Sequence, residues 1–241
     1  EILKNARFLN VFREDDRGSK AILRFANNVN EDLETLIQAL FFARWCNRQE
    51  TLDYISSDIL FNPEKLLYLM QKKDNWCNTT AYPVESIYWE GKKYSRVDAA
   101  TILFSKIKRY LTDIIQRSEG NIIRATNSVN KHFKMKNDFP IFMAITDIAW
   151  FRPDIINPAS PVPTGIGAVA YLNRLQSHLG MDNHELTSEK MIELQKEYWP
   201  DAKRKFYPID IEYLSCECRK YDSYINKTKL FKGKNIFIPK L

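Results

Sequence analysis

Residues 165–172 read Gly165-Ile166-Gly167-Ala168-Val169-Ala170-Tyr171-Leu172, and this stretch decides the fold that we expect. Two glycines around one apolar residue allow the backbone to turn sharply just before a helix begins. In such a turn, consecutive N–H groups at the start of the helix can point at a DNA phosphate. A Gly-x-Gly run is a weak signal by itself, because any loop that leads into a helix can use it. The stretch therefore predicts a helix-hairpin-helix turn that binds DNA, with a plain turn as the alternative.

A helix start signal follows downstream at Tyr207-Pro208-Ile209-Asp210. Pro208 favours the first turn of a helix and places the Asp210 carboxylate within that turn. Helix-hairpin-helix DNA glycosylases carry a similar Pro-Val-Asp after their hairpin, and this resemblance implies that Asp210 corresponds to their catalytic aspartate. A carboxylate in that position would stabilise the positive charge on a flipped nucleotide that loses its base, or would position the attacking water. The alternative is that Asp210 only caps its helix.

The sequence departs from the glycosylase pattern at two points. Asp210 follows Gly167 by 43 positions (210 − 167), about twice the spacing in that superfamily, so the resemblance implies an insertion at about residues 181–205. Glycosylases that also cut the strand have a lysine just after the hairpin, where this chain has Val169. We therefore expect no Schiff-base lyase activity.

Further helices are predicted on both sides of the glycine turn from apolar residues at helical spacing. The predicted helices cover residues 31–45, a segment that starts at Asn62-Pro63-Glu64, and residues 98–120, 138–150, 189–198 and 208–221. Residues 86–96 alternate around Glu90-Gly91 and predict a small two-stranded ribbon. We expect a mostly α, helix-hairpin-helix DNA glycosylase-like fold in a single compact unit over residues 1–241. Its hairpin core would span about residues 138–222, followed by a basic tail at 219–241.

Composition excludes several classes of protein. No stretch approaches the roughly 18 continuous apolar residues of a membrane span, and no signal peptide is recognisable, so we expect a cytoplasmic protein without a membrane partner. Four cysteines are too few for a disulfide framework. Cys216 and Cys218 lie two positions apart but lack a second ligand pair, so we expect no metal and no cofactor.

The positive charge is concentrated near the end of the chain. The net charge is +6, and residues 219–241 alone hold seven Lys or Arg against Asp222. Lys227 and Lys229 lie in this tail, and smaller basic clusters occur at 106–109, 131–136 and 203–205. Together these clusters favour double-stranded DNA as the partner, and no protein partner is predicted. A solvated basic surface without a partner is the alternative for any one cluster.

Four blocks of sequence resemble the α-glutamyl/putrescinyl thymine pyrophosphorylase family, a branch of the helix-hairpin-helix DNA glycosylase superfamily. The blocks are residues 9–18 (LNVFREDDRG), 42–51 (FARWCNRQET), 144–148 (AITDI) and 210–221 (DIEYLSCECRKY). The resemblance implies a protein that acts on modified pyrimidines in bacteriophage DNA. Some members install an amino acid or amine on activated 5-hydroxymethyluracil, and other proteins that resemble the family excise hypermodified pyrimidines as an antiviral defence.

The same blocks supply candidate site residues. The polar groups that could line a base pocket are Arg13, Asp16, Arg17, Arg44, Asn47, Arg48 and Glu50. Arg44 and Arg48 would share a helix face and could bind phosphates. In the alternative interpretation, Arg13, Asp16, Arg17 and Glu50 form an ion-pair network that braces two helices. Asp147 interrupts an apolar helix and needs either a catalytic role or a partner such as an arginine.

Three functions follow from these observations. The first is a monofunctional DNA N-glycosylase that flips a modified pyrimidine, with catalytic residues Asp210, Asp147 and Asp16 and with the turn Gly165, Ile166 and Gly167 on the DNA backbone. The second is a pyrophosphorylase-type transferase that keeps the base attached and substitutes its 5-methylene carbon. The third is a DNA-binding module without catalysis. We rank the glycosylase first.

Overall fold

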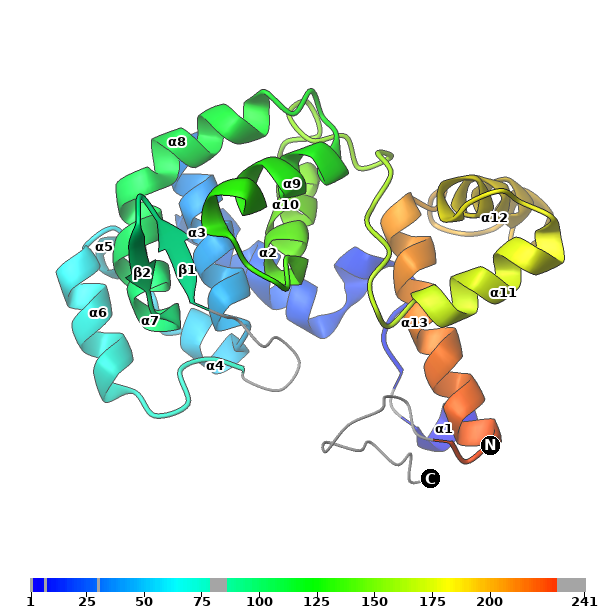
Figure 1. The fold of residues 1–241 in the computed structure, drawn as a ribbon. Coiled ribbons are helices and arrows are strands. Elements are labelled where there is room, and N and C mark those ends of the chain that lie inside the picture. Colours follow the sequence, from blue (N-terminus) through cyan, green and yellow to red (C-terminus); the bar gives the residue numbers. More distant parts are fainter. Residues whose placement is uncertain (1, 7, 30, 79–85, 229–241) are drawn as a thin grey trace. The chain divides into compact units, whose positions relative to one another are not determined.

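The computed structural model describes residues 2–6, 8–29, 31–78 and 86–228, and these residues are mostly helical (Figure 1). The structure divides into two compact units: residues 1–16 with 161–241 form unit 1, and residues 17–160 form unit 2. The mostly α fold that the sequence predicts is confirmed. The expected hairpin core at 138–222 crosses the boundary between the units, so a single compact unit over the whole chain stays a prediction.

Unit 2 is a bundle built around one buried helix. This helix is α3 (Leu33–Cys46), which is mostly apolar, is buried from Thr35 to Cys46, and packs against α2 (Arg17–Val29), α8 (Phe104–Gln116) and α10 (Phe139–Phe151). A helix without a polar face is stable only when other helices cover it. The other helical elements of unit 2 are α4 (Gln49–Leu52), α5 (Ser57–Leu60), α6 (Pro63–Lys72), α7 (Arg96–Asp98), a π-helical turn at Ala99–Leu103 and α9 (Ile122–Phe133).

Local capping signals place several of these elements where the sequence predicts them. The Asp32 carboxylate accepts the Thr35 N–H at 2.8 Å at the start of α3, and the Asn62 side chain accepts the Lys65 N–H at 3.0 Å at the start of α6. The helix expected from Asp98 begins slightly earlier, because Ser95 caps α7. Capping by a short polar side chain therefore fixes these helix starts.

The predicted ribbon is confirmed as the one sheet of the described residues. Strand β1 (Ile87–Trp89) pairs antiparallel with β2 (Lys92–Tyr94), and Ile87 lies opposite Tyr94. The two turn residues, Glu90 and Gly91, have positive φ values of 48° and 78°. Two such residues in a row make the tight turn that suits the twist of a hairpin.

Unit 1 joins the N-terminal residues to three helices from the second half of the chain. It contains α1 (Ile2–Asn5), a 3₁₀ turn at Arg13–Asp15, α11 (Val169–Leu179), α12 (His184–Tyr198) and α13 (Pro208–Ile225). Buried Ala168, Leu172, Ile192 and Ile211 join the three long helices in one core. Helix α12 occupies the predicted insertion and starts before the expected Glu189, because the Asn183 side chain caps it.

The glycine turn is preceded by a loop and followed by α11. Residues 152–168 contain no helix, and α10 ends at Phe151 in unit 2. Pro153, Pro158, Pro161 and Pro163 lie in this loop, and proline disfavours helix both at its own position and at the residue before it. No helix directly precedes the turn in the chain, and the helix-hairpin-helix assignment stays a prediction. Separately, none of the described helices is long and apolar enough to cross a membrane.

Candidate functional site

The turn at residues 165–167 lies directly against α13, and this packing explains both glycines. A Cβ atom on Gly165 would lie 2.7 Å from Glu212 Oε1, and one on Gly167 would lie 2.7 Å from Cys216 Sγ. Contacts that short force neighbouring atoms to move. The close approach of the turn to the helix therefore favours glycine at both positions.

Polar contacts from α13 hold the turn in place. The Gly165 N–H donates to Glu212 Oε1 at 3.1 Å, and Arg219 donates to the Ile166 carbonyl oxygen at 2.8 Å. The Ile166 side chain is 80% exposed. Within the described residues, the N–H groups of Ile166 and Gly167 have no hydrogen-bond partner, so they could still bind an anion. The expected phosphate contact at this turn stays a prediction.

Glu212 is the buried acid beside the turn, and sequence reasoning did not single it out. Burial raises the pKa of Glu212 to about 7, although the Gly165 N–H and the charge of Arg13 lower it in part. A carboxyl group that titrates near neutral pH is suited to proton transfer and marks a candidate functional position. The available signal was its place between Ile211 and Tyr213, inside a block already quoted for its family resemblance.

Asp210 is fully buried and both of its carboxylate oxygens are occupied. Oδ1 accepts the backbone N–H of Arg13 at 3.0 Å, and Oδ2 accepts the backbone N–H of Tyr207 at 2.8 Å and Arg204 Nη1 at 2.7 Å. These are the contacts of the capping alternative, extended to the N-terminal segment. A catalytic role for Asp210 stays a prediction, and it would require these contacts to open.

The basic cluster at residues 203–205 largely serves the protein itself. Arg204 binds Glu14 at 2.6 Å in addition to Asp210, and Lys203 binds Glu14 at 2.8 Å and Asp15 at 2.5 Å. Burial raises the pKa of Glu14, but the hydrogen bonds from Arg204 and Lys203 outweigh that effect and lower the pKa to about 2. The sequence favours a polyanion for the basic clusters taken together, but in this cluster Lys203 and Arg204 form ion pairs with three neighbouring acids, Glu14, Asp15 and Asp210.

Arg13 and Asp16 lie together in unit 1, while Arg17 belongs to unit 2. Arg13 Nη1 lies 3.7 Å from Asp16 Oδ2, and the Arg13 guanidinium lies 4.7 Å from the centre of the Tyr213 ring. Arg17 donates to the Gln49 side chain at 3.3 Å. The network of Arg13, Asp16, Arg17 and Glu50 stays a prediction. Substrate contacts by Arg13, Asp16 and Arg17 stay predictions.

Arg44 and Asp147 form a buried bidentate ion pair in the core of unit 2. Arg44 Nε and Nη2 donate to the two Asp147 oxygens at 2.5 and 2.6 Å, and both side chains are 1% exposed. The alternative of an arginine partner for Asp147 is confirmed. Arg44 is consequently occupied inside the protein, so the predicted phosphate contact by Arg44 together with Arg48 is wrong in this arrangement.

Asn47 separates Arg48 from the helix that contains Arg44. Helix α3 ends at Cys46, and Asn47 adopts a left-handed conformation with φ of 43°. Arg48 then donates to the Asn75 carbonyl oxygen at 2.6 Å and lies 3.3 Å from Glu50. Arg44 and Arg48 therefore do not share a helix face. Arg48 and Glu50 are partly exposed, and their contact with DNA stays a prediction, as does that of Asn47.

The four sequence blocks meet in pairs. In unit 1, the block at residues 9–18 contacts the block at 210–221 through Arg13 with Asp210 and through the Leu9 N–H, which donates to Glu217 at 3.0 Å. In unit 2, the block at 42–51 contacts the block at 144–148 through Arg44 and Asp147. The pattern that carries the resemblance therefore includes two buried polar contacts between distant segments.

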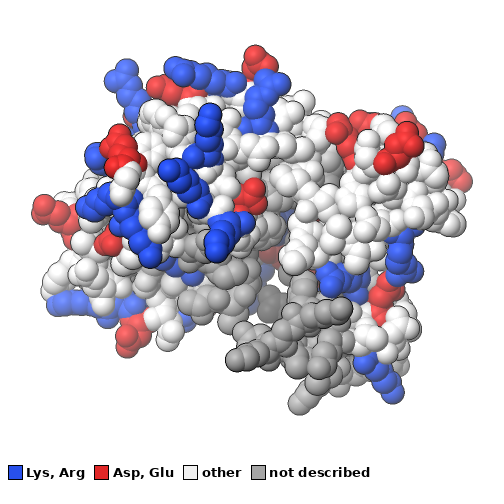
Figure 2. All heavy atoms as spheres, viewed as in Figure 1, with Lys and Arg blue, Asp and Glu red and all other residues white. Residues whose placement is uncertain are grey.

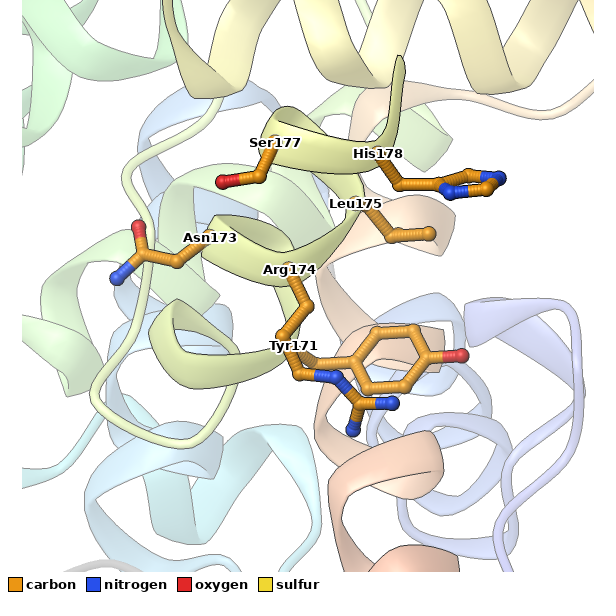
Figure 3. A pocket seen from close by; sticks show the side chains of 6 residues that line it. All are labelled: Tyr171, Asn173, Arg174, Leu175, Ser177 and His178. Atoms are coloured by element: carbon orange, nitrogen blue, oxygen red, sulfur yellow. The ribbon is translucent and has the colours of Figure 1, made fainter. Parts of the chain in front are cut away.

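Helix α11 extends from the glycine turn and forms a broad, open groove of about 740 Å³ (Figure 3). All of its lining residues belong to this helix: Tyr171, Asn173, Arg174, Leu175, Ser177 and His178. Figure 3 shows Tyr171 and Arg174 on one side and Asn173 and Ser177 on the other. Arg174 also pairs with Asp222 of α13. One exposed helix face alone does not form an enclosed binding site.

Charge is distributed differently in the two units. Helix α12 of unit 1 has four glutamates against two lysines, whereas α9 of unit 2 has Arg124 and Lys131 and no acid. Figure 2 shows Lys and Arg gathered over α8, α9 and the β1–β2 hairpin of unit 2. Lys227 is exposed in the described structure, while Lys229 and residues 230–241 of the basic tail lie outside the described residues.

Comparison with known proteins identifies a related family. Residues 1–229 match a family described as 5-hmdU DNA kinase, helical domain. No curated protein and no solved structure matches the chain. The match supports the expectation of a protein that acts on a modified pyrimidine in DNA. It does not extend to the pyrophosphorylase family or to the glycosylase superfamily.

Proposed function

The chain belongs to the family of 5-hmdU DNA kinase helical domains, and from this membership we propose that it holds 5-hydroxymethyldeoxyuridine in DNA for phosphorylation. The observation that carries the proposal is the family match over residues 1–229, which includes both units. The basic helices and hairpin of unit 2 support a role on the DNA side of the reaction, because phosphate contacts supply much of the affinity for DNA.

The proposed reaction transfers one phosphoryl group. The 5-hydroxymethyl oxygen forms a bond to the γ-phosphorus of a nucleoside triphosphate, the bond from that phosphorus to its bridging oxygen breaks, and a nucleoside diphosphate leaves. The hydroxyl proton passes to a base. One common loop that binds the phosphates of a nucleoside triphosphate has the pattern Gly-x-x-x-x-Gly-Lys-Ser/Thr. This pattern does not occur in the 241 residues.

Glu212 is our candidate for the base that accepts this proton. Its pKa of about 7 lies near the working pH, and the turn that it supports is exposed at Ile166. General bases work best when their pKa lies near the ambient pH. We expect Glu212→Gln to lower the rate of phosphoryl transfer about 100-fold or more, with little change in DNA affinity. An equal loss of DNA affinity would instead indicate a structural role.

The alternatives differ in how far the structure supports them. A glycosylase needs a carboxylate that is free to act, whereas both Asp210 oxygens are paired. Glu212 is buried as well, but among the described residues its Oε2 has no hydrogen-bond partner. The transferase alternative is chemically closer, because phosphorylation of the hydroxymethyl group produces an activated base of the kind that such a transferase consumes. Kinase and transferase would therefore act in sequence on the same carbon substituent.

The test compares two DNA duplexes that differ only in one 5-hmdU or thymidine. We expect the protein to bind the 5-hmdU duplex more tightly and, with Mg²⁺ and γ-labelled ATP, to transfer label to that duplex alone. Nucleoside mass spectrometry would identify the product. Equal affinity for both duplexes with no labelled product would overturn the proposal. Abasic sites would establish the glycosylase instead, and a heavier base with free pyrophosphate on phosphorylated DNA plus an amine would establish the transferase.

A further inference from the structure

Unit 2 contains an aromatic pocket that is separate from the glycine turn and from Glu212. The pocket has a volume of about 290 Å³ and lies where the β1–β2 hairpin meets α8 and α9. Its lining residues are Trp89, Glu90, Lys106, Ile107, Tyr110 and His132. A volume near 300 Å³ is at the small end of ligand sites and suits a single ring system rather than a long ligand.

Three aromatic rings in the pocket support one another. The Trp89 and Tyr110 ring centres lie 5.1 Å apart at an angle of 82°, and Tyr110 and His132 lie 5.2 Å apart at 89°. The Tyr110 hydroxyl also lies 3.2 Å from His132 Nε2, within hydrogen-bonding distance. Trp89 is buried, whereas Tyr110 remains 41% exposed. The pocket therefore presents an aromatic surface that is held in position and is partly open.

The surroundings of the pocket are basic. Lys106 lines it, Arg109 follows on α8, Lys131 precedes His132 on α9, and Lys92 lies opposite Trp89 on β2. Glu90 is the acid in the lining, and its carboxylate lies 3.9 Å from Lys106 Nζ. Figure 2 shows this concentration of Lys and Arg on the same part of unit 2. Such surroundings disfavour a cationic ligand and favour a flat ring that carries phosphate.

We propose that this aromatic pocket receives one unpaired base of a DNA strand while the neighbouring lysines contact its phosphates. Aromatic side chains inside a positively charged surface are the combination by which proteins hold single-stranded nucleic acid. The inference rests on the proposed function only for the choice of DNA as the nucleic acid. It adds a base contact in unit 2 that is separate from the glycine turn and from Glu212.

The experiment measures binding of fluorescent oligonucleotides by anisotropy. One strand is a thymidine oligomer, and the other has the same length and phosphates but abasic sugars. We expect Tyr110→Ala to bind the thymidine strand about tenfold more weakly and the abasic strand unchanged. Tyr110→Phe keeps the ring and loses only the hydroxyl. It should bind both strands like the unaltered protein, because the proposal assigns base binding to the ring.

Tyr68→Ala is the matched control. Tyr68 lies on α6, is 56% exposed and has Lys72 Nζ 4.1 Å from its ring centre, but it lines no part of this pocket. Equal effects of Tyr68→Ala and Tyr110→Ala would overturn the proposal, as would equal affinity of the unaltered protein for the two strands. Tyr110-dependent binding of ATP without Tyr110-dependent binding of the oligomer would assign the pocket to a free nucleotide and would also overturn it.

The outcome can be separated from that of the proposed function. The pocket is tested with ordinary thymidine strands, whereas the proposed function is tested by preference for 5-hmdU and by transfer of label. Tyr110-dependent binding without that preference would sustain the pocket and reject the function. The converse result would reject only the pocket.

Discussion

Glu212 links the stability of unit 1 to pH. Its pKa is about 7 in the folded chain against an ordinary value of 4.5, chiefly because the group is buried. A group that binds its proton more tightly when folded stabilises the fold at low pH. We therefore expect the contribution of Glu212 to the free energy of unfolding to be largest below about pH 4.5 and to fall as the pH rises toward 7.

Urea denaturation at several pH values tests this dependence. The slope from Glu212 should approach, at most, about 1.4 kcal/mol per pH unit between the two pKa values. Glu212→Gln keeps an oxygen for the Gly165 N–H and should remove that slope. Glu197→Gln, on the exposed face of α12, should leave it unchanged. A slope that persists in Glu212→Gln would contradict the assignment to this residue.

The buried Arg44–Asp147 pair makes the free energy of unfolding of unit 2 depend on both partners. Each single substitution, Arg44→Met or Asp147→Asn, leaves an unpaired or poorly paired polar group where neither side chain reaches water. We expect each to lower the free energy of unfolding by about 3–5 kcal/mol. The double variant Arg44→Met with Asp147→Leu should lose much less than the sum. Additive losses in denaturant unfolding would show that the two charges are not coupled.

The sequence could predict that Asp147 needs a partner, but not which one. An acid inside an apolar helix is costly unless it is paired, and this signal is local. Arg44 lies 103 positions away, so its identity depends on tertiary packing that no spacing rule supplies. The same limit applies to Asp210, whose partners Arg13 and Arg204 come from two other segments.

At the scale of elements, the turn and α13 form one packed unit in which each glycine has a specific neighbour. Gly167→Ala should lower the free energy of unfolding by about 1–3 kcal/mol, because the new methyl group would meet Cys216 Sγ. Cys216→Ala removes that sulfur, so the double variant should regain part of the loss. The measurement is a double-mutant cycle in urea, and absence of coupling between the two positions would contradict the close approach.

Helix starts and the hairpin were the predictable elements, because each depends on a few neighbouring residues. Each signal lies within four residues of the element that it specifies. Asn62 and Pro63 mark the start of α6, and Glu90 and Gly91 form the turn between β1 and β2. The predicted continuity from Arg44 to Arg48 failed because Asn47 adopts a left-handed conformation that ends α3. Asparagine tolerates that conformation, but its presence alone does not specify it.

At the scale of the whole molecule, unit 2 is continuous in sequence and unit 1 is not. A fragment of residues 17–160 should therefore fold with a cooperative thermal transition, because it contains α3 and every helix that covers α3. A fragment of residues 161–241 should be less stable than the same segment in the full chain, because Asp210 and Arg204 lose their partners Arg13 and Glu14. Circular dichroism melting of both fragments and the full chain provides the measurement. A non-cooperative melt of residues 17–160 would contradict the first expectation.

The division into two units was not predictable from composition. Both units are helical, both have polar surfaces, and no glycine-rich or serine-rich linker marks a boundary near residues 16 or 160. The four prolines at residues 153–163 interrupt the helical pattern, but an interruption does not reveal that the chain returns to pair with residues 9–18. That return depends on the pairing of residues 9–18 with 210–221.

Glu14 pairs with Arg204, and the Arg13 N–H donates to Asp210. These contacts also set an order of events during synthesis. A ribosome makes residues 13 and 14 before unit 2, and their partners emerge about 190 positions later, after the whole of unit 2 has been translated. The N-terminal acids must stay solvated during that interval while unit 2 folds. Unit 1 can therefore be completed only after unit 2 has been translated.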